Sequence, residues 1–115
     1  MASTDNFENT LQELRRGVIV LAVLSQLGKE EYGYSLLKLL SDKGLAVDQG
    51  TLYPLLRRLE AQRLLESAWK IEAGRPRRYY VISSEGQKLL PLLKDDWTSM
   101  VSTMGKMLKD AKEKE

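Results

Sequence analysis

The chain contains no histidine and no cysteine among its 115 residues. Without histidine it lacks the side chain that most often serves as a general base, and without both residues it lacks the usual zinc ligands. The absence of cysteine also excludes a disulfide framework and a thiolate nucleophile. These absences argue against an enzyme, and we expect neither a metal site nor a bound cofactor.

Long apolar runs are also missing, and no stretch has the length needed to span a bilayer. The first ten residues carry Asp5 and Glu8 and show no apolar core of a signal peptide. We therefore expect no membrane partner and a cytoplasmic location. The length of 115 residues and the hydrophobic content of 43% predict one modestly stable domain.

Positive charge is concentrated in one segment of the chain. Between Arg57 and Tyr80 there are seven basic residues and three acidic ones, so this segment carries more positive charge than the net +2 of the whole chain. Such a concentration is typical of a surface that contacts phosphates. A solvated basic face would give the same pattern, so charge by itself leaves both interpretations open.

Apolar residues at intervals of three and four predict four helices. They cover about residues 11–27, 34–42 and 49–62, and a long last helix runs from Ser83 or Ser84 to about residue 110. Either Asp48 or Thr51 can cap the third helix. Pro54 near its beginning removes one backbone donor and should shorten or distort the first turn.

A β-hairpin is predicted between the third and fourth helices. Residues 65–72 alternate in polarity, residues 73–76 have turn chemistry, and residues 77–82 are rich in β-forming side chains. We interpret Trp69 and Tyr80 as core residues. Three helices, a hairpin and a long helix make a mainly α fold with a small β-hairpin. That order is typical of a winged helix-turn-helix, with the third helix as the recognition helix and the hairpin as the wing.

Three motifs resemble those of the PadR family of transcriptional regulators. They are Glu31 to Leu37 (EYGYSLL), Gly50 to Glu60 (GTLYPLLRRLE), and Gly74 to Tyr80 (GRPRRYY) followed by Ser84-Glu85-Gly86. Their order and spacing fit the family from about Leu14 to Trp97. Arg63 departs from the pattern, because the family commonly has glycine there. Arg63 must therefore adopt a glycine-like conformation at some cost, or the recognition helix ends differently.

The resemblance implies a sequence-specific DNA-binding transcriptional regulator that represses as a homodimer on a pseudo-palindromic duplex operator. The expected organisation is a flexible N-terminus (1–10), a DNA-binding winged helix-turn-helix domain (11–82), a C-terminal dimerisation helix (83–110) and a charged tail (111–115). The resemblance also implies that the last helix packs on the N-terminal and C-terminal helices of the partner. The alternative is a winged-helix module that binds a protein and never touches DNA.

Eight residues are expected to contact DNA, from the start of the second helix, the recognition helix and the wing. They are Tyr34, Gln49, Thr51, Tyr53, Arg57, Arg75, Arg77 and Arg78. Arginines at the wing tip would reach phosphates, whereas Gln49 and Thr51 would alter sequence preference if they reach base edges. Surface packing is the competing interpretation of Tyr53. Arg58 is interpreted as solvated or paired with Glu60.

Six residues are expected at a dimer interface, since the last helix carries a nearly heptad apolar stripe. They are Leu14, Val18, Leu93, Trp97, Met100 and Met104. Trp97 has two interpretations. It fills the interface, or it meets its own copy near a two-fold axis and, with Asp96 and Met100, holds a small aromatic effector. The resemblance implies that an effector of this kind is possible, because many family members respond to small aromatic or stress-related compounds.

Overall fold

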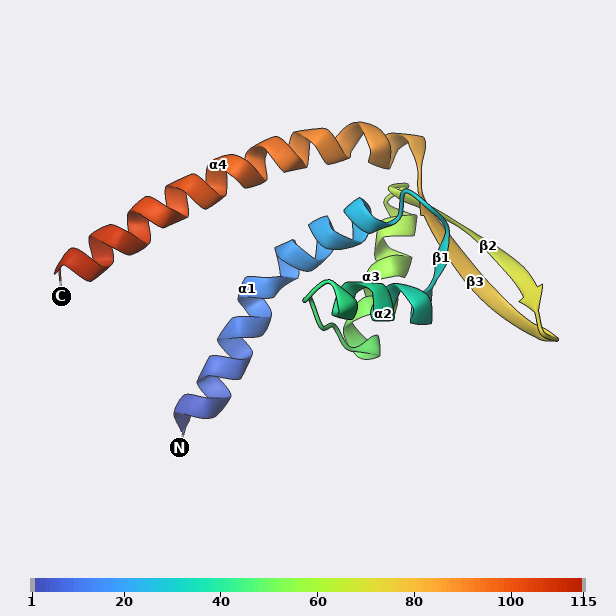
Figure 1. Ribbon diagram of the computed structural model, residues 1–115, viewed down its shortest axis with the longest axis horizontal. Coiled ribbons are helices and arrows are strands. Elements are labelled where there is room, and N and C mark those ends of the chain that lie inside the picture. The colour runs from blue at the N-terminus through green and yellow to red at the C-terminus, as the bar shows by residue number, and fades with distance from the viewer. Residues whose placement is uncertain (1, 115) are drawn as a thin grey trace.

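The computed structural model describes residues 2–114, which form four helices and a three-stranded antiparallel sheet (Figure 1). In chain order the elements are α1 (Ala2–Gln26), β1 (Glu31–Tyr32), α2 (Gly33–Asp42), α3 (Gln49–Ala61), β2 (Leu65–Glu72), β3 (Arg75–Ile82) and α4 (Ser84–Lys114). This architecture confirms the predicted mainly α winged helix-turn-helix with a long C-terminal helix.

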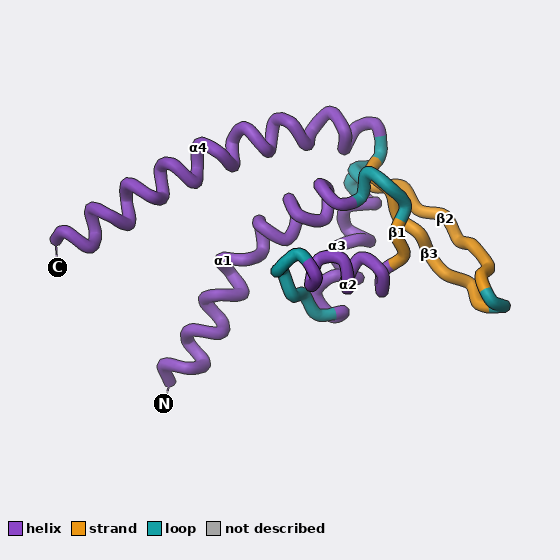
Figure 2. The backbone as a smooth tube through the Cα atoms, viewed as in Figure 1, coloured by secondary structure: helices purple, strands orange, loops and turns teal. Residues whose placement is uncertain are grey.

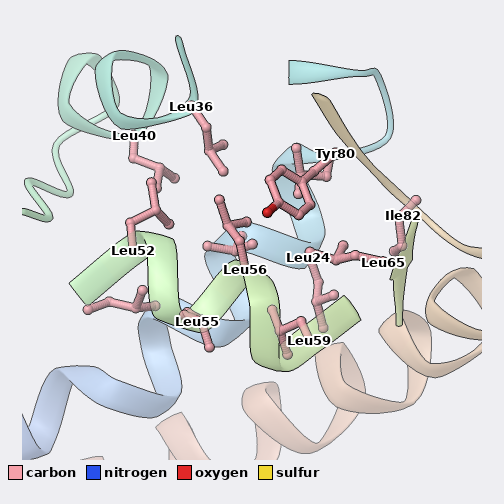
Figure 3. Close-up of a cluster of buried hydrophobic side chains, with 13 residues drawn as sticks. Leu24, Leu36, Leu40, Leu52, Leu55, Leu56, Leu59, Leu65, Tyr80 and Ile82 are labelled. Atoms are coloured by element: carbon pink, nitrogen blue, oxygen red, sulfur yellow. The ribbon is translucent and has the colours of Figure 1, made fainter. Parts of the chain in front are cut away.

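The core lies where α1, α2 and α3 meet the base of the sheet. The buried residues of α3 are Leu52, Leu55, Leu56 and Leu59, which recur along one side of the helix. In Figure 3, Leu52 and Leu40 of α2 point toward one another across the cluster. Burial of each such leucine contributes roughly 1.5–3 kcal/mol relative to exposure. This burial fixes α3 with its opposite side turned outward.

The sheet has the order β1-β3-β2, and β2 pairs with β3 along its full length. The two-residue strand β1 was not predicted, because two residues cannot show alternation. It adds to the sheet beside Tyr79 and Tyr80. The backbone N–H of Ile82 donates to the carbonyl of Leu27 over 2.8 Å, which ties the end of α1 to the base of the wing.

The wing turns over two residues, so the predicted four-residue turn at 73–76 was wrong. Ala73 and Gly74 have φ angles of 52° and 75°, as a two-residue hairpin turn requires. β3 therefore begins at Arg75, two residues earlier than predicted. Pro76 is accepted in this strand because it pairs with Ile71, the second pair from the turn, which needs no N–H toward β2.

α3 ends before a residue in the left-handed conformation, Arg63, where the family commonly has glycine. Arg63 has φ of 66°, and the N–H of Leu64 donates to the carbonyl of Leu59 over 2.9 Å. The same arrangement ends α2, where Gly44 has φ of 101°. Of the two alternatives that the sequence left open at Arg63, the structure has the glycine-like conformation.

Both terminal helices are longer than predicted. α1 begins at Ala2, so the segment expected to be a flexible N-terminus is helical from that residue. The apolar stripe continues upstream through Leu11 and Phe7, and Asp5 lies in the first turn, where the helix dipole favours a negative charge.

α4 continues to Lys114, since no glycine or proline follows Gly105. It thus covers most of the segment expected to be a charged tail. Residues 1 and 115 lie outside the described residues. The side chain of Ser83 caps the helix by accepting a hydrogen bond from the N–H of Gly86. No helix within residues 2–114 is long and apolar enough to cross a membrane.

Candidate nucleic-acid interface

The wing projects from one end of the molecule, and the two chain termini lie at the other (Figure 2). α3 lies against the base of the wing and exposes Pro54, Arg57 and Arg58 on the side away from the core. Gln49 and Thr51 are exposed in its first turn. The exposed side of α3 and the wing are therefore the parts of the fold that can approach a large ligand together.

The two candidate capping residues of α3 interact with each other. Asp48 occupies the position that precedes the helix, and its carbonyl accepts the N–H groups of Thr51 and Leu52. The hydroxyl of Thr51 donates to the carboxylate of Asp48 over 2.7 Å. Because this proton is engaged, the hydroxyl of Thr51 is available to another group only as an acceptor.

A depression of about 350 Å³ lies between the start of α2, α3 and the wing. Its lining is aromatic and basic and includes no acidic side chain: Tyr32, Gly33, Tyr34, Tyr53, Leu56, Arg57, Trp69, Arg77, Arg78 and Tyr80. Five of the eight predicted DNA contacts therefore line one surface. The other three are exposed outside it, with Arg75 at the wing tip and Gln49 and Thr51 at the start of α3.

Tyr53 is half-buried in this depression and packs closely on the backbone at the start of α2. A Cβ atom added to Gly33 would lie 2.6 Å from Cε1 of Tyr53, so only glycine permits this approach. Burial raises the pKa of Tyr53 above its usual value of 10.0, and the nearby phenols of Tyr32 and Tyr34 raise it further. The hydroxyl of Tyr53 therefore stays protonated at neutral pH and can donate a hydrogen bond.

Arg78 connects the wing to α3. Its guanidinium donates to the carboxylate of Glu60 over 2.7 Å and to the hydroxyl of Ser67 over 3.1 Å, while Ser67 donates to Glu60 over 2.6 Å. Of the two interpretations of Arg58, pairing with Glu60 is wrong, because Arg58 is exposed and the partner of Glu60 is Arg78. The charge of Arg78 is thus compensated within the protein, and its three-way network fixes the wing against α3.

Arg57 and Arg77 differ from Arg78 in having no acidic partner. Among the residues that the structure describes, the ion pairs are Arg16–Glu13, Lys70–Glu30 and Arg78–Glu60. Arg57 is exposed, and the guanidinium of Arg77 lies 4.5 Å from the ring centre of Tyr32. These two arginines leave uncompensated positive charge in the depression.

The interpretation of Trp69 as a core residue was wrong, whereas that of Tyr80 is confirmed. Tyr80 is 6% exposed, but Trp69 is 65% exposed. Both side chains lie on the same face of the hairpin, and the hairpin extends beyond the core that covers this face at its base. Alternation along 65–72 correctly predicted the face of Trp69 but not where the core ends. Trp69 and Tyr32 are lining residues that the sequence did not single out as binding residues.

The residues expected at a dimer interface lie on α1 and α4. On α4, Trp97, Met100 and Met104 are exposed in the single chain, as is Asp96. Leu93 is partly buried and packs against the core of its own chain. On α1, Leu14 is exposed and Val18 is half-buried.

Comparison with known proteins agrees with this geometry. Residues 20–91 match the transcriptional regulator PadR-like family. The chain is 38% identical over 81 residues to Transcriptional regulator Rv3488 of Mycobacterium tuberculosis, covering 70% of this chain and 76% of that protein.

Solved structures show the same similarity. A PadR family transcriptional regulator from Eggerthella lenta is 44% identical, with a TM-score of 0.84 and coverage of 94% of this chain and 96% of that one. A PadR-like transcriptional regulator from Bacillus cereus is 31% identical, with a TM-score of 0.73 and coverage of 84% and 96%.

Proposed function

The chain belongs to the PadR-like family of transcriptional regulators and is thus a DNA-binding regulator, and from this premise we propose that it is a homodimeric repressor. Members of this family are transcriptional regulators rather than enzymes. In our proposal α3 enters the major groove and the wing lies on the backbone beside it. The observation that carries the proposal is the depression between α3 and the wing, which is lined by three arginines and no acidic residue.

Each group of predicted residues has a separate task in this proposal. Arg57, Arg75 and Arg77 bind phosphates, because they are cationic and have no acidic partner among the described residues. Gln49 and Thr51, exposed at the start of α3, meet base edges. Tyr34 and Tyr53 supply phenol groups beside the phosphates. Arg78 holds the wing in place through Glu60 and Ser67.

Dimerisation is supported by an apolar stripe on α4 that continues past the body of the chain. At its start the stripe packs on the core of the same chain through Leu90 and Leu93. Farther along, Trp97, Met100, Val101, Met104, Met107 and Leu108 are all exposed. An exposed apolar surface of this extent marks an association site. We assign it to a second copy, packed through α4 and the exposed Leu14 of α1.

A two-fold dimer presents two recognition helices and therefore binds a pseudo-palindrome, with half-sites about 10 bp apart or a multiple of that spacing. Repression then follows from occupancy, since a protein bound across promoter DNA blocks access by polymerase. We expect packing to be the main role of Trp97. Release by a planar aromatic effector, held by Trp97, Asp96 and Met100 of both chains, is the second role proposed for this position.

Selection of binding sites from random duplex DNA tests this function, and measurement of affinity against salt concentration tests its electrostatic basis. We expect a two-fold symmetric site and a steep loss of affinity with salt, because phosphate contacts release counterions. Arg75→Ala and Arg77→Ala should weaken binding to all sequences about equally, whereas Gln49→Ala should change sequence preference. Lys94→Ala on α4 is the matched control for removal of an exposed charge.

A flat dependence on salt, or no selected sequence, would contradict the proposal. It would favour instead a winged-helix module that binds a protein partner.

A further inference from the structure

One face of the wing carries an apolar surface that the proposed function leaves unused. Cross-strand partners share a face of the sheet, so Leu65, Tyr80 and Ile82 lie on the same face as Trp69 and Ile71. The first three are buried against the core at the base of the wing. Trp69 and Ile71, nearer the tip, are 65% and 79% exposed. We call the exposed part, formed by Trp69 and Ile71, the inner wing face.

The inner wing face adjoins the uncompensated positive charge of Arg57 and Arg77. Trp69 lines the same depression as Arg57 and as Arg77, which pairs with Lys70 and therefore projects from the other face of the hairpin. A ligand that fills the depression therefore meets an indole ring and two guanidinium groups, and the lining includes no acidic side chain. Such a ligand must combine an apolar surface with negative charge.

The sugar–phosphate backbone of DNA has this combination, because each deoxyribose presents C–H groups between two phosphates. An acidic protein segment with apolar side chains is the competing occupant. The position of Arg57 favours the nucleic acid, because this residue lies on the exposed side of α3, which enters the major groove in our proposal.

Arg78, the cross-strand partner of Trp69, lies beside it on the same face of the wing. The guanidinium of Arg78 lies 5.7 Å from the indole ring centre while it bonds to Glu60 and Ser67. Because Glu60 belongs to α3, the network that fixes the wing also sets the position of the indole relative to the recognition helix. The contact with Arg78 therefore favours one position of an indole that is otherwise largely exposed.

We propose that the depression holds one sugar–phosphate strand of duplex DNA, with Trp69 packed against a deoxyribose and Arg57 and Arg77 on neighbouring phosphates. This assignment rests on the proposed function and adds Trp69 to the DNA-binding residues. Arg78 becomes a positioning residue that acts through Trp69 and the wing.

The fluorescence of Trp69 tests the contact directly. The chain has two tryptophans, so Trp97→Phe leaves Trp69 as the single tryptophan, which can be excited selectively over the five tyrosines. On titration with a duplex selected from random DNA, its emission should change and its quenching by acrylamide should fall. The reverse variant, Trp69→Phe, reports from Trp97 and should show no such protection. If Trp69 stays as accessible to acrylamide in the complex as in the free protein, the proposal is wrong.

Affinity and its salt dependence provide a second test that does not depend on Trp97→Phe. Trp69→Ala should lower affinity about tenfold through loss of apolar contact. It should leave the slope of log K against log salt unchanged, because no charge is removed. Arg57→Ala should lower both the affinity and the slope, the slope by about 0.9 if one phosphate contact is lost. Circular dichroism and thermal melting of each variant establish that it is folded.

The remaining outcomes also decide the question. Unchanged affinity of Trp69→Ala for a duplex that the wild type binds would overturn the role of Trp69 and leave the proposed function intact. A loss of slope together with affinity would make Trp69 a support for the arginines rather than a contact. Equal affinity for the separated strands would exclude the duplex as the occupant. If the wild type binds no duplex, the proposed function fails and this inference fails with it.

Discussion

At the scale of single residues, the ends of α2 and α3 show how the same backbone conformation is reached with different side chains. Gly44 and Arg63 both follow a helix and both have positive φ. Glycine adopts this conformation freely, whereas an L-residue with a Cβ atom pays roughly 1–2 kcal/mol there. The hydrogen bonds of the two helix ends match, so the side chain is the main difference between them.

Arg63→Gly is therefore expected to stabilise the protein by about 0.5–1 kcal/mol, because relief of strain exceeds the extra entropy of glycine in the unfolded chain. Chemical denaturation measures the change. Gly44→Ala is the matched reverse substitution, since no atom within 4 Å would meet the added Cβ and only the φ of 101° opposes it. It should destabilise by about 1 kcal/mol. A destabilised Arg63→Gly would show that the side chain of Arg63 makes a contact worth more than the strain.

At the scale of elements, the wing and the recognition helix behave as one unit because Arg78, Ser67 and Glu60 join them. The ion pair is neither fully buried nor free in solvent, with side chains 34% and 29% exposed. Its energy is therefore moderate, since solvent screens part of the attraction. Its directional hydrogen bonds still restrict the angle between the two elements.

Arg78→Ala should lower the free energy of unfolding by about 1–2 kcal/mol, because it leaves the carboxylate of Glu60 without its partner. Arg75→Ala, at the exposed wing tip, should change it by less than about 0.5 kcal/mol. A double-mutant cycle with Glu60→Ala should give a coupling energy on the order of 1 kcal/mol between the two side chains. If Arg78→Ala and Arg75→Ala are equally stable, the network does not fix the wing.

At the scale of the whole molecule, α4 extends away from α2, α3 and the wing toward its C-terminal end (Figure 1), and this part of the helix carries the exposed apolar stripe. Residues 2–114 have extents of 60 × 38 × 24 Å, which is elongated for a chain that must bury its apolar residues. A second copy that covers the stripe would bury these exposed apolar residues. Folding and dimerisation would then be coupled.

Met104→Asp should disrupt the proposed dimer, because it places a charge within the apolar stripe. Met104 is 47% exposed in the single chain, so the substitution is tolerated by the isolated chain but not by the interface. Analytical ultracentrifugation should show a monomer if the variant is soluble. Otherwise the variant should be recovered as insoluble protein. Lys94→Asp, an exposed position on the same helix, is the control. A variant at Met104 that stays dimeric would place the interface elsewhere.

The proposed effector site also belongs to this scale, since Trp97 is 39% exposed in one chain and would meet its copy only in the dimer. With Trp69→Phe as background, planar aromatic cations should quench Trp97 and weaken the complex with DNA if an effector is held there. Absence of quenching across a chemically broad panel would leave Trp97 as a packing residue.

Local patterns in the sequence determined most of the elements. Leucine spacing in residues 52–59 fixed the buried side of α3, and alternation in residues 65–72 fixed the faces of β2, because both depend only on neighbouring residues. The motifs around Tyr53 and Arg77 resembled the PadR family, to which the chain belongs. The departure at Arg63 limited the end of α3 to two alternatives, of which the structure has the strained conformation.

The tertiary structure decided what depends on residues far apart in the chain. Strand β1 forms only because it can pair with the edge of β3. Trp69 is exposed only because the wing extends beyond the hydrophobic core. Arg77 and Arg78 are adjacent and equally basic, yet one keeps its charge uncompensated and the other is paired with Glu60, 18 residues away. Adjacent residues of a strand face opposite sides of the sheet, so packing around each side determines which charge remains available for a ligand.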